Sequence, residues 1–230
     1  MEEKGVETIA KYAEEYGLGD KTGVEIDEYS PKIADEYPIT MAIGQSNNNY
    51  TTIQLARYVS AVANSGTVYN LTLLNKVTDT EGNVLETYEP SVKNTMDNVA
   101  DSTWDAIHQG MRMVVETHSQ FDGLSVQAAG KTGTTNSSKD TWFCGYTRYY
   151  TTAIWVGYDI PRNMPGIYGA TYAGRIWKSV MDQIHEGLEP WDWIQPETVE
   201  RKVDTKTGIE DYFSTTAQFR AEQSLHEKEQ

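Results

Sequence analysis

The sequence has little of what metal, redox and membrane proteins depend on. One cysteine permits no internal disulfide, and four scattered histidines without CxxC or HExxH spacing provide no ligand set for zinc, so we expect no metal, no redox chemistry and no cofactor. Apolar runs stay far below the roughly 18 residues of a membrane-spanning helix. Because charged residues follow Met1 directly, in place of an apolar signal core, we also expect no leader and no membrane segment in this chain.

Basic residues are scarce as well. The chain has 19 Lys and Arg against 34 Asp and Glu, which gives a formal net charge of −15. Nucleic acids and anionic membranes are bound through clusters of basic side chains, so we expect neither as a partner. Residues 1–37 carry 11 acidic and 4 basic side chains, and residues 186–230 carry 11 and 5. The middle of the chain is therefore close to neutral, and we look for the chemistry there.

Helical periodicity occurs in four segments of a chain whose 230 residues suffice for one large domain with its own core. The segments are residues 6–16, 51–64, 102–116 and 176–184. Thr51 is a suitable N-cap for the second helix, and Ser102 with Asp105 has the spacing of a capping box for the third. We therefore expect four amphipathic helices.

Strand-like alternation fills much of the remaining chain. Residues 67–88 are interpreted as two β segments, and residues 124–134, 140–147 and 151–158 as an antiparallel meander with short polar connections. Because the last of these strands is apolar on both faces, we expect it to lie in the interior of the sheet. The predicted fold class is α/β of the α+β type. Residues 1–200 form its body, and residues 201–230 form an acidic polar tail that is mobile from residue 214 onward.

The tripeptide Lys-Thr-Gly occurs three times, beginning at Lys21, Lys131 and Lys206. The first copy lies in a polar loop and the third in the acidic tail, where this tripeptide is simply favourable turn chemistry. The copy at Lys131 differs, because it continues a strand on which residues 128–130 are all Ala or Gly. Small side chains let another backbone come close, so a ligand could lie along that strand.

The residues around Lys131 resemble a known family in their identity and order. From residue 130 onward they are Gly130-Lys131-Thr132-Gly133-Thr134-Thr135, Asp140, Trp142-Phe143, Gly145-Tyr146 and Trp155-Val156-Gly157. The earlier ones are Ile43-Gly44-Gln45, then Thr51, Gln54, Leu55 and Ala56, and later Gly110-Met111 with Val114-Val115. Over roughly residues 5–190 this order resembles the transpeptidase domain of penicillin-binding proteins, especially the bifunctional class A type.

The resemblance implies a fold, a reaction and a set of ligands. The fold is that of the serine β-lactamases and penicillin-binding transpeptidases, an antiparallel sheet with helices on its faces. In that family a serine of an SxxK motif is acylated by a D-Ala-D-Ala stem peptide, and the KTG strand forms one wall of the cleft. Stem peptides and β-lactams are the implied partners. The implied parent protein is a serine-type DD-transpeptidase on the outer face of the bacterial cytoplasmic membrane, with a glycosyltransferase domain upstream.

By the same resemblance, the substrate-binding residues are Lys131, Thr132, Gly133 and Thr134. The ammonium of Lys131 would supply positive potential and a hydrogen bond, and the hydroxyls of Thr132 and Thr134 would hold the terminal carboxylate of the substrate. The backbone N–H of Thr134 would contribute to the oxyanion hole.

The nucleophile motif of this family, SxxK, is absent, because no Ser is followed by Lys three positions later, and we expect no TxxK in its place. We therefore expect no catalytic residue in this chain. Ser46-Asn47-Asn48 matches the second family motif, SxN, but it follows Ile43-Gly44-Gln45, whereas the family motif precedes that segment, so we interpret it as a coincidence. The chain is expected to be the C-terminal half of the domain, incomplete on its N-terminal side, with the missing half as its partner. A truncated gene model, a split gene and a partial clone all remain open.

Alternative sites have weaker support. Cys144 lies in mid-strand and is interpreted as a small buried hydrophobe, not a nucleophile. His108, His118, His185 and His226 show no spacing that indicates a site. Trp191 and Trp193 are expected to pack the end of the last helix against the body.

Two alternative functions stay open beside the leading one. The chain could be a non-enzymatic remnant or stem-peptide binding module, or it could belong to a serine β-lactamase or β-lactam sensor. The first alternative follows from the missing nucleophile. The second shares the KTG strand but fits the aromatic pattern less well.

Overall fold

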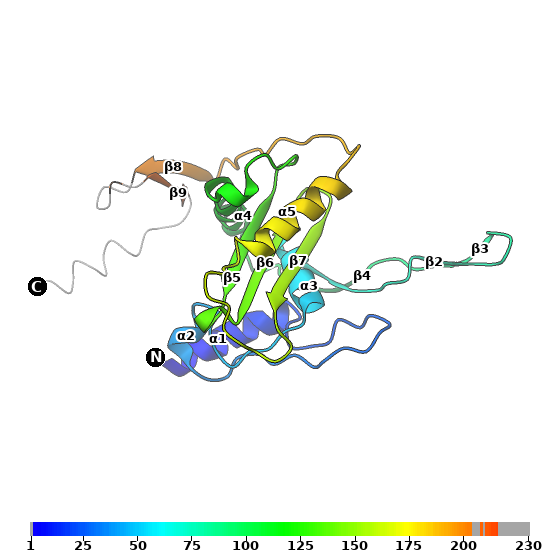
Figure 1. Ribbon diagram of the computed structural model, residues 1–230, viewed down its shortest axis with the longest axis horizontal. Helices are drawn as coiled ribbons and strands as arrows, with labels where there is room; N and C mark the ends of the chain where they lie inside the picture. The colour runs from blue at the N-terminus through cyan, green and yellow to red at the C-terminus, as the bar shows by residue number, and fades with distance from the viewer. Residues whose placement is uncertain (1, 204–207, 209, 216–230) are drawn as a thin grey trace, which may run out of the picture.

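The computed structural model describes residues 2–203, 208 and 210–215 of the chain (Figure 1). Its helices are α1 (Glu2–Glu15), α2 (Pro38–Met41), α3 (Thr52–Ala63), α4 (Asp101–Thr117) and α5 (Tyr172–Ile184), with short 3₁₀ turns η1 (Ser119–Phe121) and η2 (Asn136–Ser138). Its strands are β1 (Thr67–Asn70), β2 (Lys76–Thr78), β3 (Val84–Thr87), β4 (Ser91–Thr95), β5 (Ala129–Thr134), β6 (Asp140–Tyr146), β7 (Thr151–Gly157), β8 (Val199–Val203) and β9 (Glu210–Ser214).

The central sheet is the antiparallel meander β5-β6-β7, as the sequence pattern predicted. In the part of the chain that the structure describes, β7 is an edge strand, so the interior position expected for residues 151–158 stays a prediction for the sheet of the complete domain. Both of its faces are nevertheless covered, by α3 on one side and α5 on the other (Figure 1). Apolar alternation reports whether the faces of a strand are buried and carries no information about its lateral neighbours.

Helix α5 covers one face of the sheet through large side chains. Phe143, Trp177 and Met181 are all fully buried, and the rings of Phe143 and Trp177 lie 5.1 Å apart, centroid to centroid. Gly145 permits this approach, since a Cβ there would lie 3.0 Å from the Trp177 ring. The α5 face is therefore packed closely enough to hold the strands in place.

Helix α3 covers the other face and begins where the sequence predicted. The hydroxyl of Thr51 accepts the N–H of Gln54, and the Gln54 side chain accepts the Thr51 N–H at 2.8 Å. The predicted capping box at Ser102 and Asp105 is wrong: α4 starts at Asp101, and Ala100 at its N-cap makes no side-chain bond. The carboxylate of Asp105 accepts the hydroxyl of Thr198 instead, which draws it away from the helix terminus.

The segment between α3 and α4 forms two successive antiparallel pairs that extend away from the body (Figure 1). β1 pairs with β4, and further out β2 pairs with β3 across a turn in which Asp79 accepts the N–H groups of Glu81 and Asn83. The sequence predicted two β segments over residues 67–88, where the structure has the three strands β1, β2 and β3. It missed β4, whose residues are polar apart from Val92, are mostly exposed and give no alternation.

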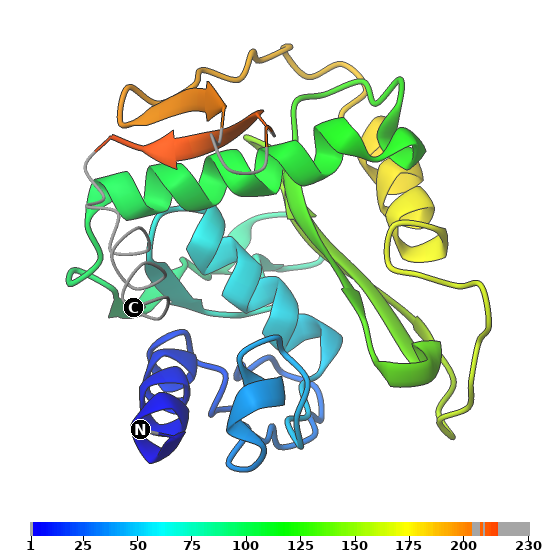
Figure 2. The ribbon, with the colours of Figure 1, turned by 90° about the vertical axis from the view of Figure 1, so that its left-hand side faces the viewer.

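The segment after α5 returns to α4. β8 and β9 pair over Val199–Val203 and Glu210–Ser214 and lie along α4 (Figure 2). The boundary predicted at residue 200 therefore falls within β8, whose first residue, Val199, is buried, whereas Glu200, Arg201 and Lys202 after it are charged. Residues 204–207, 209 and 216–230 lie outside the described part, so the mobility expected from residue 214 onward stays a prediction. Across the described residues, the structure has no helix both long and apolar enough to cross a membrane.

Candidate functional site

The Lys-Thr-Gly copy at Lys131 lies on β5, whose outer edge faces no strand among the described residues. Thr135 donates its N–H to the carbonyl of Asp140, at 3.0 Å, so the odd-numbered residues of this strand point their backbone groups toward β6. The even-numbered residues therefore point theirs outward. Side chains from two other elements bond such outward carbonyls: Arg112 of α4 donates to Ala128 O at 3.0 Å, and Gln45, from the loop after α2, donates to Thr134 O at 2.9 Å.

The ammonium of Lys131 lies at this same edge. Its side chain is exposed, and Nζ donates to the outward carbonyl of Thr132 at 2.8 Å. Thr132 and Thr134 stand opposite Phe143 and Thr141 of β6, on the face that α5 covers. The structure thus places one cation and outward backbone N–H groups at one strand edge, and two hydroxyls on the α5 face of the same strand.

Thr134 is held by two segments that are remote in sequence. Gln45 binds its carbonyl from the loop after α2, and Gly169 donates its N–H to the hydroxyl at 3.1 Å from the loop before α5. Sequence reasoning identified the segment around Gln45 but missed Gly169. The glycine lies in a turn-rich stretch with no periodic pattern, so no sequence signal marked its position.

The turn after Thr134 is fixed by a carboxylate. Asp140 accepts the Trp155 indole N–H at 3.1 Å through Oδ1 and the Thr135 hydroxyl at 3.1 Å through Oδ2. Within the turn, Ser137 and Ser138 have positive φ values of 60° and 49°. Such backbone persists only where the surroundings hold it, and here the carboxylate network provides that support.

Cys144 lies beside Lys131 in the register of the sheet and is 8% exposed. Burial raises the pKa of its thiol to about 12, so the thiol is protonated at neutral pH and is not a nucleophile. The structure supports the interpretation of this residue as a small buried hydrophobe.

The other two copies of the tripeptide do not form a second site. At the first, the Lys21 carbonyl accepts a hydrogen bond from the buried guanidinium of Arg57, and Thr22, 2% exposed, donates its hydroxyl to Glu28 at 2.8 Å. This copy lies in a loop tied to α3. Lys206 lies outside the described residues.

The SxN match has a local role in the same loop as Gln45. Ser46 donates its hydroxyl to the Glu36 carbonyl, and the Asn47 side chain accepts the Asp35 N–H at 3.2 Å. These bonds close the loop that carries Gln45 toward β5.

The expectation that no TxxK occurs is wrong, because Thr8 and Lys11 of α1 have this spacing. Both side chains are exposed, and the Lys11 ammonium lies 3.5 Å from the Glu15 carboxylate. A lysine that is ion-paired in water is a poor base for an adjacent hydroxyl, so this pair does not replace the missing motif.

His108 makes contacts that its sequence position did not indicate. Its Nε2 lies 3.1 Å from the Ser65 hydroxyl, and its Nδ1 bonds the Tyr146 hydroxyl. Ser65, however, is the left-handed residue that ends α3, with φ 60°. The backbone N–H groups of the next two residues cannot serve as oxyanion donors because both are already bonded. The Gly66 N–H donates to the Ala61 carbonyl, and the Thr67 N–H donates to Asn64 Oδ1. The group therefore joins α3, α4 and β6 and does not form a hydrolytic site.

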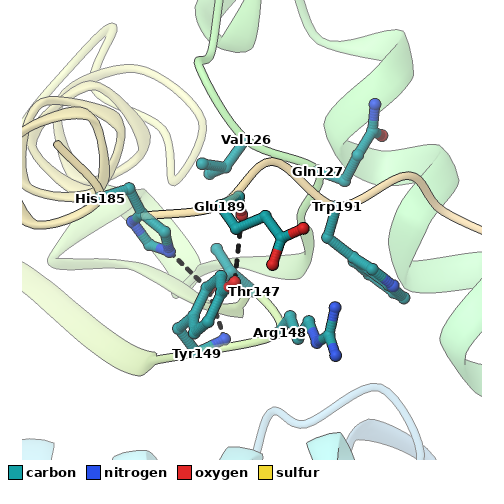
Figure 3. Close-up of a pocket in the computed structure, with 8 residues that line it drawn as sticks. All are labelled: Val126, Gln127, Thr147, Arg148, Tyr149, His185, Glu189 and Trp191. Carbon is teal, nitrogen blue, oxygen red and sulfur yellow. Dashed lines mark hydrogen bonds between the residues drawn. The ribbon is translucent and has the colours of Figure 1, made fainter. Parts of the chain in front are cut away.

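A small hollow beside the β6–β7 turn is drawn in Figure 3. His185, 5% exposed, uses both ring nitrogens there: Nδ1 bonds Met181 O and Nε2 bonds the Thr147 hydroxyl, each at 2.8 Å. The Tyr149 hydroxyl donates to Glu189 O at 3.0 Å. These polar groups bond one another, so the hollow has little to offer a ligand.

Trp193 packs against α4. Its indole N–H donates to Gln109 at 3.2 Å, and the Arg112 guanidinium lies 5.9 Å from the ring centroid. This tryptophan therefore joins the segment after α5 to α4, and the expectation that Trp191 and Trp193 pack the end of the last helix against the body stays a prediction in its remaining part.

The family model described as "Penicillin binding protein transpeptidase domain" matches residues 2–182 of the chain. Penicillin-binding protein 1A of Clostridium botulinum is 30% identical over 193 residues, which are 83% of this chain and 22% of the relative. The protein of the same name from Clostridium acetobutylicum is 29% identical over 94% of this chain and 25% of its own length. The chain thus spans about a quarter of the length of these relatives.

Solved structures agree on the fold. Penicillin-binding protein 1A of Haemophilus influenzae matches 92% of this chain and 37% of its own with a TM-score of 0.64 at 18% identity. Penicillin-binding protein A of M. tuberculosis, solved as an imipenem acyl-enzyme complex, matches 80% of this chain and 44% of its own with a TM-score of 0.65, also at 18% identity. This chain therefore has the fold of penicillin-binding transpeptidases, an antiparallel sheet with helices on its faces, as predicted.

Proposed function

The chain belongs to the transpeptidase-domain family of the class A penicillin-binding proteins, and we propose that it supplies the substrate-binding strand of a peptidoglycan DD-transpeptidase. The observation that carries the proposal is the open edge of β5. Gly130, Thr132 and Thr134 direct their backbone groups away from β6. An extended stem peptide can bind such an edge as an added strand, with main-chain hydrogen bonds providing affinity.

The end of the strand suits a carboxylate. The terminal carboxylate of a D-Ala-D-Ala peptide binds the Lys131 ammonium and the hydroxyls of Thr132 and Thr134, since charge-assisted hydrogen bonds are the strong ones. Because Gly133 has no side chain, nothing projects from the strand between the two threonines, and the ligand can approach closely.

The Thr134 N–H is the proposed oxyanion donor. During acylation a serine oxygen attacks the carbonyl of the penultimate D-Ala, the terminal D-Ala leaves with a proton, and the acyl group is then transferred to an amine of a second stem peptide. A backbone N–H aimed at the developing oxyanion contributes on the order of 10²–10³ in rate. In this chain the outward direction of the Thr134 backbone supports that role.

The acylated serine is proposed to come from sequence outside these 230 residues, because no SxxK occurs in them. The parent protein is proposed to be a serine-type DD-transpeptidase on the outer face of the cytoplasmic membrane, with a glycosyltransferase domain upstream. β-Lactams, which resemble the stem peptide and carry a carboxylate, are proposed to occupy the same strand.

Labelling with a fluorescent penicillin tests the proposal. We expect no SDS-resistant adduct on the 230-residue chain, because acylation needs an activated hydroxyl. A longer protein that includes the upstream sequence should be labelled, and Thr134→Val should slow its labelling about tenfold or more. An adduct on the short chain would place the nucleophile inside it. Reversible binding of a D-Ala-D-Ala peptide to the short chain, with no labelling of the longer protein, would favour the non-enzymatic binding module.

A further inference from the structure

The loop that precedes α5 meets the end of β5 backbone to backbone. Gly169 is buried, and a Cβ at this position would lie 2.4 Å from the Trp142 carbonyl oxygen and 2.7 Å from the Gly133 carbonyl oxygen. No side chain fits in that space, because real Cβ atoms do not approach backbone oxygens so closely. The absence of a side chain is what brings the Gly169 N–H to within 3.1 Å of the Thr134 hydroxyl.

This contact determines what the Thr134 hydroxyl can do. An N–H group can only donate, so the hydroxyl oxygen must be the acceptor, and its own proton then remains for another partner. Among the described residues, no protein acceptor takes that proton. The hydroxyl is therefore free to donate to a ligand at this end of β5.

The loop is anchored so that Gly169 cannot turn away easily. Its carbonyl accepts the Gly174 N–H at 2.9 Å, in the first turn of α5. Next to it, the Thr171 hydroxyl accepts the Tyr168 N–H, and the Thr171 N–H donates to the Tyr168 carbonyl, both at 2.9 Å. The two backbone groups of Gly169 thus connect the beginning of α5 to the end of β5.

We infer that Gly169 is a positioning residue for substrate recognition: it holds the Thr134 hydroxyl as a hydrogen-bond donor toward the carboxylate of the ligand. The inference rests on the proposed function of β5, and it adds the loop before α5 to the recognition machinery. Gln45 holds the carbonyl of the same residue, so the backbone and the side chain of Thr134 are fixed by different loops.

The test uses the transpeptidase protein that contains this chain, with a fluorescent penicillin as the free acid and as its methyl ester. We expect Gly169→Ala to slow acylation by the free acid about tenfold and to leave the ester nearly unaffected, because only the acid carries the carboxylate that Thr134 binds. In a Thr134→Val background, Gly169→Ala should cause no further loss with the acid, since the two changes remove one interaction.

Gly166→Ala is the matched control, because Gly166 lies in the same loop and a Cβ there would meet no atom within 4 Å. Its positive φ of 78° also places some strain on the loop backbone, so this control accounts for a general disturbance of the loop. It should leave the ratio of acid to ester rates unchanged. Equal slowing of both ligands by Gly169→Ala, or losses that add to those of Thr134→Val, would overturn the inference. If Thr134→Val itself leaves the ratio unchanged, the proposed function of the strand fails instead.

A second measurement avoids any change at Gly169, in case Gly169→Ala does not fold. Amide hydrogen exchange at Gly169 should be faster in Thr134→Val than in the wild-type protein, and should return to the wild-type rate in Thr134→Ser, which keeps the hydroxyl. An exchange rate that is the same in all three proteins would show that the hydroxyl does not hold this amide, and the inference would fall.

Discussion

Gln45 donates its side-chain amide to the carbonyl of Thr134 across 2.9 Å, although 89 positions separate the two residues in the sequence. The bond joins the loop after α2 to the outer edge of β5. It occupies a carbonyl that would otherwise point into solvent at the strand edge, and thereby fixes the peptide group that follows Thr134.

Gln45→Leu should therefore slow acylation by a β-lactam in the complete transpeptidase protein, by about threefold to tenfold, because the end of β5 loses one of its two supports. The measurement is the second-order rate of labelling by a fluorescent penicillin. Ser46→Ala is the control: its hydroxyl bonds Glu36 in the same loop and does not contact β5. A slower rate in Ser46→Ala than in Gln45→Leu would argue that the loop as a whole matters and not this bond.

The two described Lys-Thr-Gly copies allow a matched comparison. Lys131→Ala should lower the labelling rate at least tenfold, since it removes the ammonium at the strand edge. Lys21→Ala should leave the rate unchanged, because Lys21 is held to Arg57 through its backbone carbonyl, which the substitution keeps. Equal rates for the wild type and Lys131→Ala would place the carboxylate site elsewhere.

His108 predicts a dependence of stability on pH. Burial lowers its pKa below the ordinary value of about 6.5, and the nearby Asp105 carboxylate opposes this only in part. The unfolded chain takes up a proton as the pH falls through about 6.5 while the folded imidazole stays neutral, so stability is complete above that pH and is lost as the pH falls toward the folded pKa. Denaturant unfolding at pH 7.5 and 5.5 should show a smaller difference in unfolding free energy between the two pH values for His108→Gln than for the wild type. The same difference in both proteins would show that His108 is not the source of the pH dependence.

The packing of α5 against the sheet predicts a large local contribution to stability. Trp177→Ala should cost about 3–5 kcal/mol of unfolding free energy, because it leaves a cavity beside Phe143 and Met181. Tyr172→Ala on the same helix, at an exposed position, should cost less than about 0.5 kcal/mol. Thermal or denaturant unfolding measures both. A small effect at Trp177 would show that the α5 face is not closely packed.

The outer edge of β7 predicts association. Within the described residues no strand pairs with it, so its backbone groups can pair with another chain. The 230 residues expressed alone should be oligomeric or poorly soluble, and should become soluble on co-expression with the upstream sequence. Sedimentation velocity distinguishes the outcomes, and a monomer with a sharp cooperative melt would refute the prediction.

Sequence periodicity predicted the features that depend on local pattern. The helices around Val59 and Trp177 and the three-stranded meander follow from apolar spacing, and Lys131 to Thr134 were placed on a strand by the small residues before them. Relations between distant segments left no such pattern. The Gly169 contact, the pairing of β4 and the hairpin on α4 all depend on which segments meet in space, which alternation does not encode.

The capping box predicted for α4 shows the same limit at a single residue. Ser102 and Asp105 have the required spacing, but a carboxylate binds whichever donor the fold brings to it. That donor is the Thr198 hydroxyl, 93 positions away. Local preference was overridden by tertiary structure.

The burial of Cys144 makes this chain convenient for site-specific chemistry. It is the only cysteine in the sequence, and at neutral pH its thiol is shielded and protonated. A cysteine introduced at Glu81, in the exposed β2–β3 turn, would therefore be the thiol that a maleimide dye modifies. A dye there sits at the end of the extension in Figure 1, well removed from β5, and would report the tumbling of the molecule without touching the strand that binds the ligand.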